Sequence, residues 1–141
     1  MAGNQGTLSA EEKAAVRQAA AEARRKMTPE QLAEDMRQKI AEMPDADRVL
    51  AERIDEIVTE VAPQLSAKTY YGMPAWADEK GRIVVFFQNA SKFKVRYATL
   101  GFNDAAQLDE GTMWPTSFAL TTLTKADEKR IAELVKRAVS V

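Results

Sequence analysis

The chain has 141 residues, a formal net charge of −1 and 45% hydrophobic residues, which predicts one folded domain and argues against disorder or electrostatic capture of DNA. It contains neither cysteine nor histidine, which excludes disulfides, thiol nucleophiles, histidine-based triads and zinc sites built from thiolate or imidazole. No apolar run approaches the length of a membrane span, and the first six residues lack the features of a secretory signal. We therefore expect a cytoplasmic protein whose partners include neither nucleic acid nor membrane.

The N-terminal part predicts two helices. Residues 1–8 are expected to be disordered, and the capping-box spacing of Ser9 and Glu12 then predicts a helix to about Lys26.

The second helix is predicted to begin at Thr28, which stands three residues before Gln31 in another capping box. Apolar residues recur along it and would seat it on its own domain or on a second copy of the chain: Leu32, Met36, Ile40 and Met43. We place a tail and helical extension at residues 1–43 and an α+β domain at residues 44–141. A homodimer would then form through residues 28–43.

A third helix is predicted over residues 46–61, and its apolar positions have the spacing of a face docked on a sheet: Leu50, Ile54, Ile57, Val58 and Val61. Its other face carries Asp55, Glu56 and Glu60. These carboxylates either face solvent or hold a cation loosely.

The middle of the chain contains the predicted strands. The apolar, β-branched and aromatic run at residues 82–88 is typical of a strand buried on both faces. The four residues 78–81 end in Gly81, which predicts a bulged hairpin that joins residues 75–77 to this strand. Just before it, Gly72 and Pro74 interrupt the strand pattern, which indicates either a bend or a pocket wall.

The next segment, residues 92–97, alternates between apolar and basic residues. Phe93, Val95 and Tyr97 would point to the core, while the three basic residues between them would face water or an anion. We predict a strand here, followed by a turn at residues 100–102.

The last part predicts a polar loop over residues 103–111, a strand from Ser117 to about Thr122, and a helix that Thr124 caps and that runs to Val139. Helices, then clustered strands, then a helix predict an α+β fold in which helices pack on an antiparallel sheet.

The stretch Tyr70-Tyr71-Gly72-Met73-Pro74-Ala75-Trp76, after a docked helix that ends at Ala62-Pro63, resembles the YdhG-like family of small bacterial domains over residues 44–139. The segment from Phe87 to Leu120 is similar to a subgroup that bears a helical N-terminal extension. The resemblance implies a curved antiparallel sheet with helices against it and a largely uncharacterised function.

One branch of that family has been likened to frataxin and assigned an iron-chaperone role through acidic residues. Many relatives carry a histidine after the apolar strand, whereas this chain has Ser91-Lys92-Phe93-Lys94 there. A positive charge disfavours a cation site, so the iron role transfers poorly.

Three functions follow, and none needs a cofactor other than iron. In the first, a non-enzymatic domain binds an unknown small molecule or protein on a concave aromatic and basic sheet face, lined by Tyr70, Met73, Trp76, Arg96 and Trp114. In the second, an iron chaperone uses surface carboxylates: Asp55, Glu56, Glu60, Asp104, Asp109 and Glu110. The third is the homodimer. An enzyme has the least support, because no nucleophile–base pair can be identified.

Overall fold

The computed structural model describes residues 9–140, and for residues 22–25 it describes the backbone alone. The tail expected at residues 1–8 lies outside this range. The helices are α1 (Ala10–Arg25), α2 (Pro29–Ala41), α3 (Asp45–Val61), α4 (Ala90–Phe93) and α5 (Lys125–Ala138). The strands are β1 (Ser66–Tyr70), β2 (Met73–Ala77), β3 (Ile83–Gln88), β4 (Ala98–Phe102) and β5 (Ser117–Leu120).

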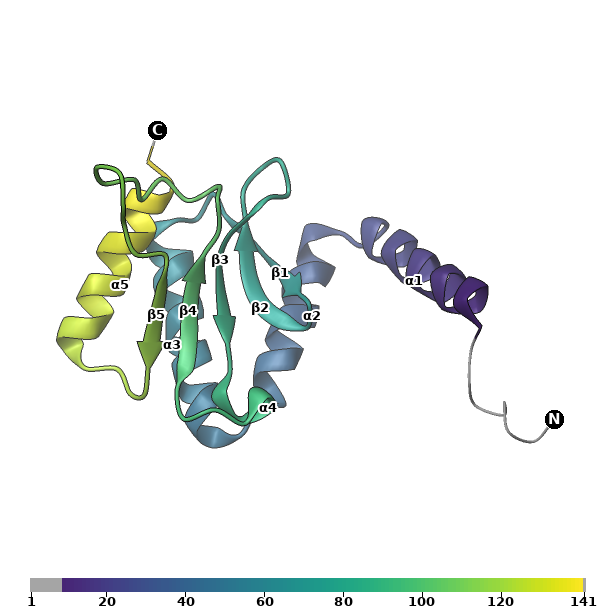
Figure 1. The fold of residues 1–141 in the computed structure, drawn as a ribbon, viewed down its shortest axis with the longest axis horizontal. Helices are drawn as coiled ribbons and strands as arrows, with labels where there is room; N and C mark the ends of the chain where they lie inside the picture. The colour runs from purple at the N-terminus through teal and green to yellow at the C-terminus, as the bar shows by residue number, and fades with distance from the viewer. Residues whose placement is uncertain (1–8, 141) are drawn as a thin grey trace.

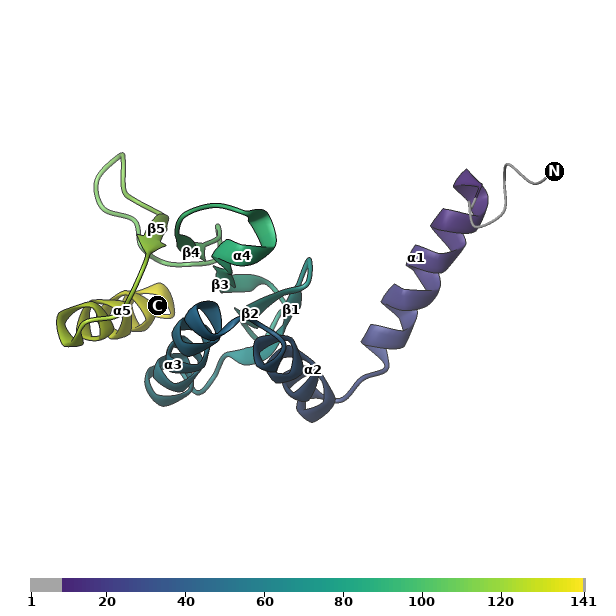
Figure 2. The same ribbon diagram turned by 90° about the horizontal axis from the view of Figure 1, so that it is seen from below.

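The five strands form one antiparallel sheet in the order β1-β2-β3-β4-β5 (Figure 1). Helices α2, α3 and α5 cover one face, which we call the helix-covered face, while the opposite or open face carries only α4 and nearby loops (Figure 2). The predicted α+β fold is thereby confirmed. Among residues 9–140, no helix has both the length and the apolarity that crossing a membrane requires.

Local signals in the sequence fix most of the helix starts. All three predicted capping boxes form: Ser9 with Glu12, Thr28 with Gln31, and Thr124 with Asp127. In each box the side chain and backbone of the two residues exchange hydrogen bonds, which satisfies N–H groups that a helix start leaves open.

The core lies between the helix-covered face of the sheet and α2, α3 and α5. Its largest fully buried side chains include Trp76, Phe87, Met36 and Ile54. The apolar stripe of α2 is used within the chain, because Met36 is 0% and Ile40 is 3% exposed. The surface predicted for a homodimer through residues 28–43 is therefore already occupied.

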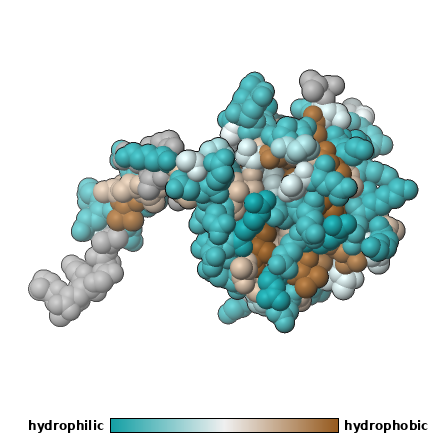
Figure 3. Space-filling view, turned by 180° about the vertical axis from the view of Figure 1, so that it is seen from behind, coloured by the Kyte–Doolittle hydropathy of each residue, from teal (hydrophilic) through white to brown (hydrophobic). Residues whose placement is uncertain are grey.

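The packed body accordingly begins at α2, earlier than the boundary drawn at residue 44. Helix α1 projects away from it (Figure 1), and its apolar Val16 is 56% exposed. Seen from the helix side, the surface is mainly hydrophilic, with narrow apolar patches between the hydrophilic residues (Figure 3).

The hairpin predicted through residues 78–81 is confirmed. Gly81 has a φ of 79°, its N–H donates to the Asp78 C=O at 2.9 Å, and the Asp78 N–H donates to the Arg82 C=O at 2.9 Å, which is the expected bulge. A further irregularity shifts the register between β2 and β3 at Trp76/Ala77. The bend expected at Gly72 and Pro74 is instead a second hairpin: Tyr71 and Gly72 both have positive φ, as a two-residue type I′ turn requires. Pro74 lies inside β2 and pairs with Thr69 of β1. The pairing of β2 with β3 does not reach it, because that pairing ends at Ala75.

The strand predicted over residues 92–97 is wrong. Residues 90–93 form the single turn of α4, Lys94 adopts the left-handed conformation that ends it, and Phe93 and Val95 are 44% and 48% exposed. The turn predicted at residues 100–102 is also wrong, because these residues belong to β4 and pair with β3. The alternating pattern was misleading because a distant carboxylate on α3, described below, starts a helical turn at residue 90.

Candidate functional site

The structure separates the five residues predicted to form one ligand site: Tyr70, Met73, Trp76, Arg96 and Trp114. Tyr70 and Met73 are register partners on the open face, where Tyr70 is partly exposed and Met73 is buried. Trp76, three positions after Met73, lies on the helix-covered face and is 1% exposed. Arg96 lies on the exposed segment after α4, and Trp114 packs against the core from the loop before β5.

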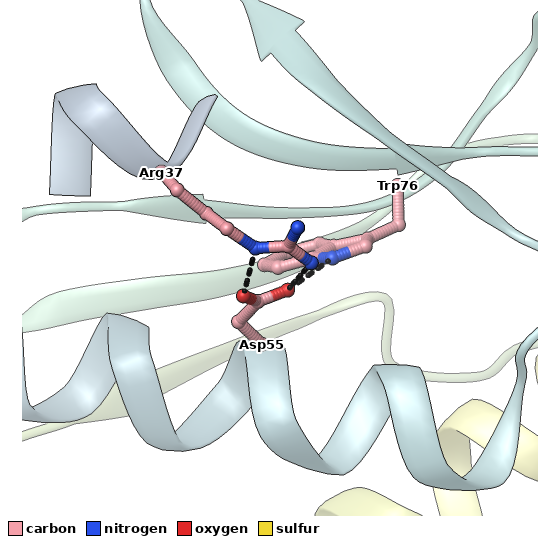
Figure 4. Close-up of polar contacts among 3 residues, drawn as sticks. All are labelled: Arg37, Asp55 and Trp76. Atoms are coloured by element: carbon pink, nitrogen blue, oxygen red, sulfur yellow. Dashed lines mark hydrogen bonds and ion pairs between the residues drawn. The ribbon is translucent and has the colours of Figure 1, made fainter. Parts of the chain in front are cut away.

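Trp76 has a structural role, because it belongs to a hydrogen-bonded group of three side chains that links α2, α3 and β2 (Figure 4). Its indole Nε1 donates to Asp55 Oδ1 on α3 at 3.2 Å, and Arg37 Nε on α2 donates to Asp55 Oδ2 at 2.9 Å. The Asp55 side chain is 14% exposed and so meets both donors largely out of water. This carboxylate joins α2, α3 and β2 and is not open to a cation.

The carboxylates proposed for iron are also scattered. Glu110 lies 3.8 Å from Arg137, and Asp104 and Asp109 line a separate cavity of about 450 Å³ beside Trp114. Among the described side chains, those of residues 9–21 and 26–140, no group of three or more acids is placed to hold a metal ion. The structure therefore gives no support to the predicted iron cluster.

Aromatic rings gather on the open face near the β1–β2 turn. The Tyr70 ring lies 5.5 Å from the Phe86 ring and 4.8 Å from the Tyr71 ring, measured between centroids. Phe86 in turn lies across Gly101, where a Cβ atom would come within 2.2 Å of its Cζ atom. The glycine therefore lets the Phe86 ring lie flat on the sheet.

A cavity of about 580 Å³ lies beside these rings, at the edge of β1, and its volume is within the range of small-molecule sites. One wall is Lys68, Tyr70, Tyr71 and Gly72 with their strand neighbours. The other is Ala21 on α1, Met27 in the connection after it and Leu32 on α2. No carboxylate is among its lining residues, as far as the side chains of residues 9–21 and 26–140 show.

One lysine lines the cavity, and a second lies beside the turn that forms its wall. Lys68 lines it, and Lys92 Nζ lies so close to Gly72 that a Cβ there would be 2.9 Å away. Among the side chains of residues 9–21 and 26–140, neither lysine has an ion-pair partner, and Lys92 Nζ lies 5.7 Å from the centroid of the neighbouring Phe93 ring. The middle of the chain is locally basic: residues 61–103 contain six Lys and Arg residues but only two Asp and Glu residues. The net charge of −1 for the whole chain does not reveal this local excess of positive charge.

Tyr71 is the first of two residues that the sequence-based prediction of the site missed. Its φ is 50°, a conformation uncommon outside glycine, and its side chain is 84% exposed. An exposed ring on a left-handed backbone contributes little to stability, and such strain is often found at functional sites. The aromatic content of the motif was visible in the sequence, but the turn that presents this ring was not.

Asp47 is the second residue that the prediction missed, and it positions Lys92 through α4. Its carboxylate accepts hydrogen bonds from the N–H groups of Ala90 at 3.0 Å and Ser91 at 3.1 Å, and from Ser91 Oγ at 2.5 Å. Burial alone would raise the pKa of Asp47, but these hydrogen bonds outweigh it and keep the pKa below its ordinary value. The signal in the sequence was an acid in line with Leu50 and Ile54 on the apolar face of its helix.

Comparison of the chain with family models, with curated proteins and with solved structures gave no significant match. The resemblance to the YdhG-like family therefore rests on the sequence motif alone.

Proposed function

We propose that the protein is a non-enzymatic binding domain that holds a small organic anion with a flat apolar ring in the cavity beside the β1–β2 turn. The observation that supports this most is that Lys68 and the rings of Tyr70 and Tyr71 line one cavity, while Lys92 lies next to Gly72 in its wall; neither lysine forms an ion pair with a described side chain. A ring in the ligand would stack on the tyrosines, and its acid group would meet the lysines.

The proposal keeps the aromatic and basic sheet face of the sequence analysis but moves the site. Trp76 and Trp114 are not part of the proposed site, because Trp76 is in the core and Trp114 lines a separate cavity. Tyr71, Lys68 and Lys92 enter it. The iron-chaperone alternative has no comparable support, since no three of the described carboxylates are placed to hold a metal ion.

The experiment is a fluorescence titration of the full chain with anilinonaphthalene sulfonate, a probe that combines flat rings with an acid group. We expect saturable binding of one probe per chain under native conditions. Lys68→Gln and Tyr71→Asn should each weaken it by roughly tenfold, the effect of one lost charge-assisted or stacking contact. Lys136→Gln, on α5, removes the same charge far from the cavity and should leave binding unchanged.

Two results would contradict the proposal. One is binding that is equally strong in Lys68→Gln, Tyr71→Asn and the Lys136→Gln control. The other is fluorescence that rises only when the chain begins to unfold, which thermal melting of each variant would reveal.

A further inference from the structure

The edge of β5 exposes backbone groups that no strand within residues 9–140 satisfies. The N–H of Phe102 donates to the C=O of Thr116 at 2.8 Å, and antiparallel pairing then alternates along β5. Phe118 and Leu120 direct their backbone groups to β4, whereas Ser117 and Ala119 direct theirs outward. Since β5 ends the strand order, the N–H and C=O groups of these two residues face away from the sheet.

The two edges of the sheet differ in how they are protected. At the other edge, β1 packs against α2 and contains Lys68. Strand β5 has the sequence Ser-Phe-Ala-Leu, with no charge, proline or bulge. Soluble proteins normally block such an edge or cover it, because it is a template for another strand.

A groove of about 210 Å³ lies beside this edge, between β5 and α5. Its apolar lining comes from Leu108, Phe118 and Leu134. The Arg130 guanidinium lies over the Phe118 ring, 5.3 Å from its centroid. An incoming strand would thus find apolar side-chain contacts next to the open hydrogen bonds.

The charges around the groove indicate the partner. They are two acids and two bases: Glu110, Glu133, Arg130 and Arg137. An acidic segment would be repelled by the glutamates, and a basic one by the arginines. Glu110 and Arg137 already lie 3.8 Å apart within the chain, which leaves Glu133 and Arg130 for a partner. A second copy of the chain, related by a twofold axis, can pair its Arg130 with this Glu133 and its Glu133 with this Arg130.

We propose that two copies of the chain associate through β5, pairing these strands antiparallel so that one continuous sheet runs through the dimer. Only Ser117 and Ala119 offer outward backbone groups, so the strands alone would hold the copies weakly. The groove between β5 and α5 supplies the remaining contact, and the dimer should depend on protein concentration.

Sedimentation equilibrium of the full chain, from micromolar to several hundred micromolar, tests this proposal. The mass should rise toward that of a dimer. Ala119→Pro removes an outward N–H that β4 does not use, in an edge position that tolerates proline, and should leave the chain monomeric. Ala119→Ser retains the N–H and should associate like the wild type.

A charge reversal gives a second readout that does not touch the strand backbone. Glu133→Arg leaves three bases against one acid and should weaken association by roughly tenfold. Adding Arg130→Glu to this variant restores equal numbers of acids and bases and should recover much of the lost association. A wild-type chain that stays monomeric throughout overturns the proposal and leaves the edge to a segment of another protein. A dimer that survives both Ala119→Pro and Glu133→Arg also overturns it.

Discussion

The two faces of the sheet show two different uses of aromatic and charged residues. On the helix-covered face, Trp76 is buried and its N–H is satisfied by Asp55, which Arg37 also engages. On the open face, Tyr71 is exposed, and the ammonium groups of Lys68 and Lys92 form no ion pair with any described side chain. Residues of the first kind contribute to folding, and those of the second kind are available for recognition.

This contrast predicts that substitutions will separate stability from binding. The largest effect is expected for Trp76→Ala, because it opens a cavity in the core and removes the donor to Asp55. We expect a loss of about 3–5 kcal/mol in the free energy of unfolding, measured by chemical denaturation. Trp76→Phe keeps most of the ring and should lose only about 1 kcal/mol. A loss under 1 kcal/mol for the alanine variant would mean that the ring is not part of the core.

Asp47→Ala should have the next largest effect, because it leaves the N–H groups of Ala90 and Ser91 without their acceptor. We expect a loss of about 2–3 kcal/mol at neutral pH. Asp45→Ala, in the same helical turn but with an exposed side chain, is the matched control and should lose less than about 0.5 kcal/mol.

The pH dependence of the Asp47 contribution follows from the direction of its pKa shift. The folded-state pKa is below the unfolded one, so the contribution is fully present above the unfolded pKa, about 3.9. It is lost as the pH falls through the folded-state pKa. The difference between wild type and Asp47→Ala, followed by denaturation, should thus be constant from pH 6 to pH 8, roughly, and shrink on acidification. A difference that grows on acidification would contradict this sign.

Gly101→Ala, on the open face, should lower the free energy of unfolding by an intermediate amount. Its new Cβ would displace the Phe86 ring, at a cost of about 1–3 kcal/mol. Because Phe86 touches Tyr70, probe binding should weaken as well. Thr99→Ala, two residues earlier on the same face of β4, should change neither property by more than about 0.5 kcal/mol. Equal behaviour of the two variants would show that the Phe86 ring is not held in place by Gly101.

The smallest effect on stability is expected for Tyr71→Asn. Asparagine tolerates the left-handed backbone at this position better than tyrosine, and the lost ring is 84% exposed. The melting temperature should stay the same or rise slightly, while probe binding falls. A marked loss of stability would place Tyr71 among the structural residues.

The sequence predicted the parts of the fold that local chemistry decides. The capping boxes at Ser9, Thr28 and Thr124 and the hairpin that ends in Gly81 depend on residues within four positions of one another, and all formed. The segment at residues 92–97 was mispredicted because its conformation is set by Asp47, more than forty positions away.

The candidate site was harder to predict because it depends on the face to which each ring points. Tyr70, Tyr71 and Trp76 stand together in the sequence, but the two-residue turn at Tyr71 and Gly72 sets the register and sends Trp76 to the opposite face. A one-residue change of register would reverse that assignment. The aromatic motif was thus recognisable, whereas its division into core and site was not.

The central claim is that recognition belongs to the open face, at the β1–β2 turn. An amide nitrogen–proton correlation spectrum of the full chain, titrated with anilinonaphthalene sulfonate, tests it most directly. The account predicts shifts concentrated at residues 68–72 and at Lys92, with the signals of α3 and α5 unchanged. Shifts concentrated on α3 or α5, or no shifts at all at saturating probe, would contradict it.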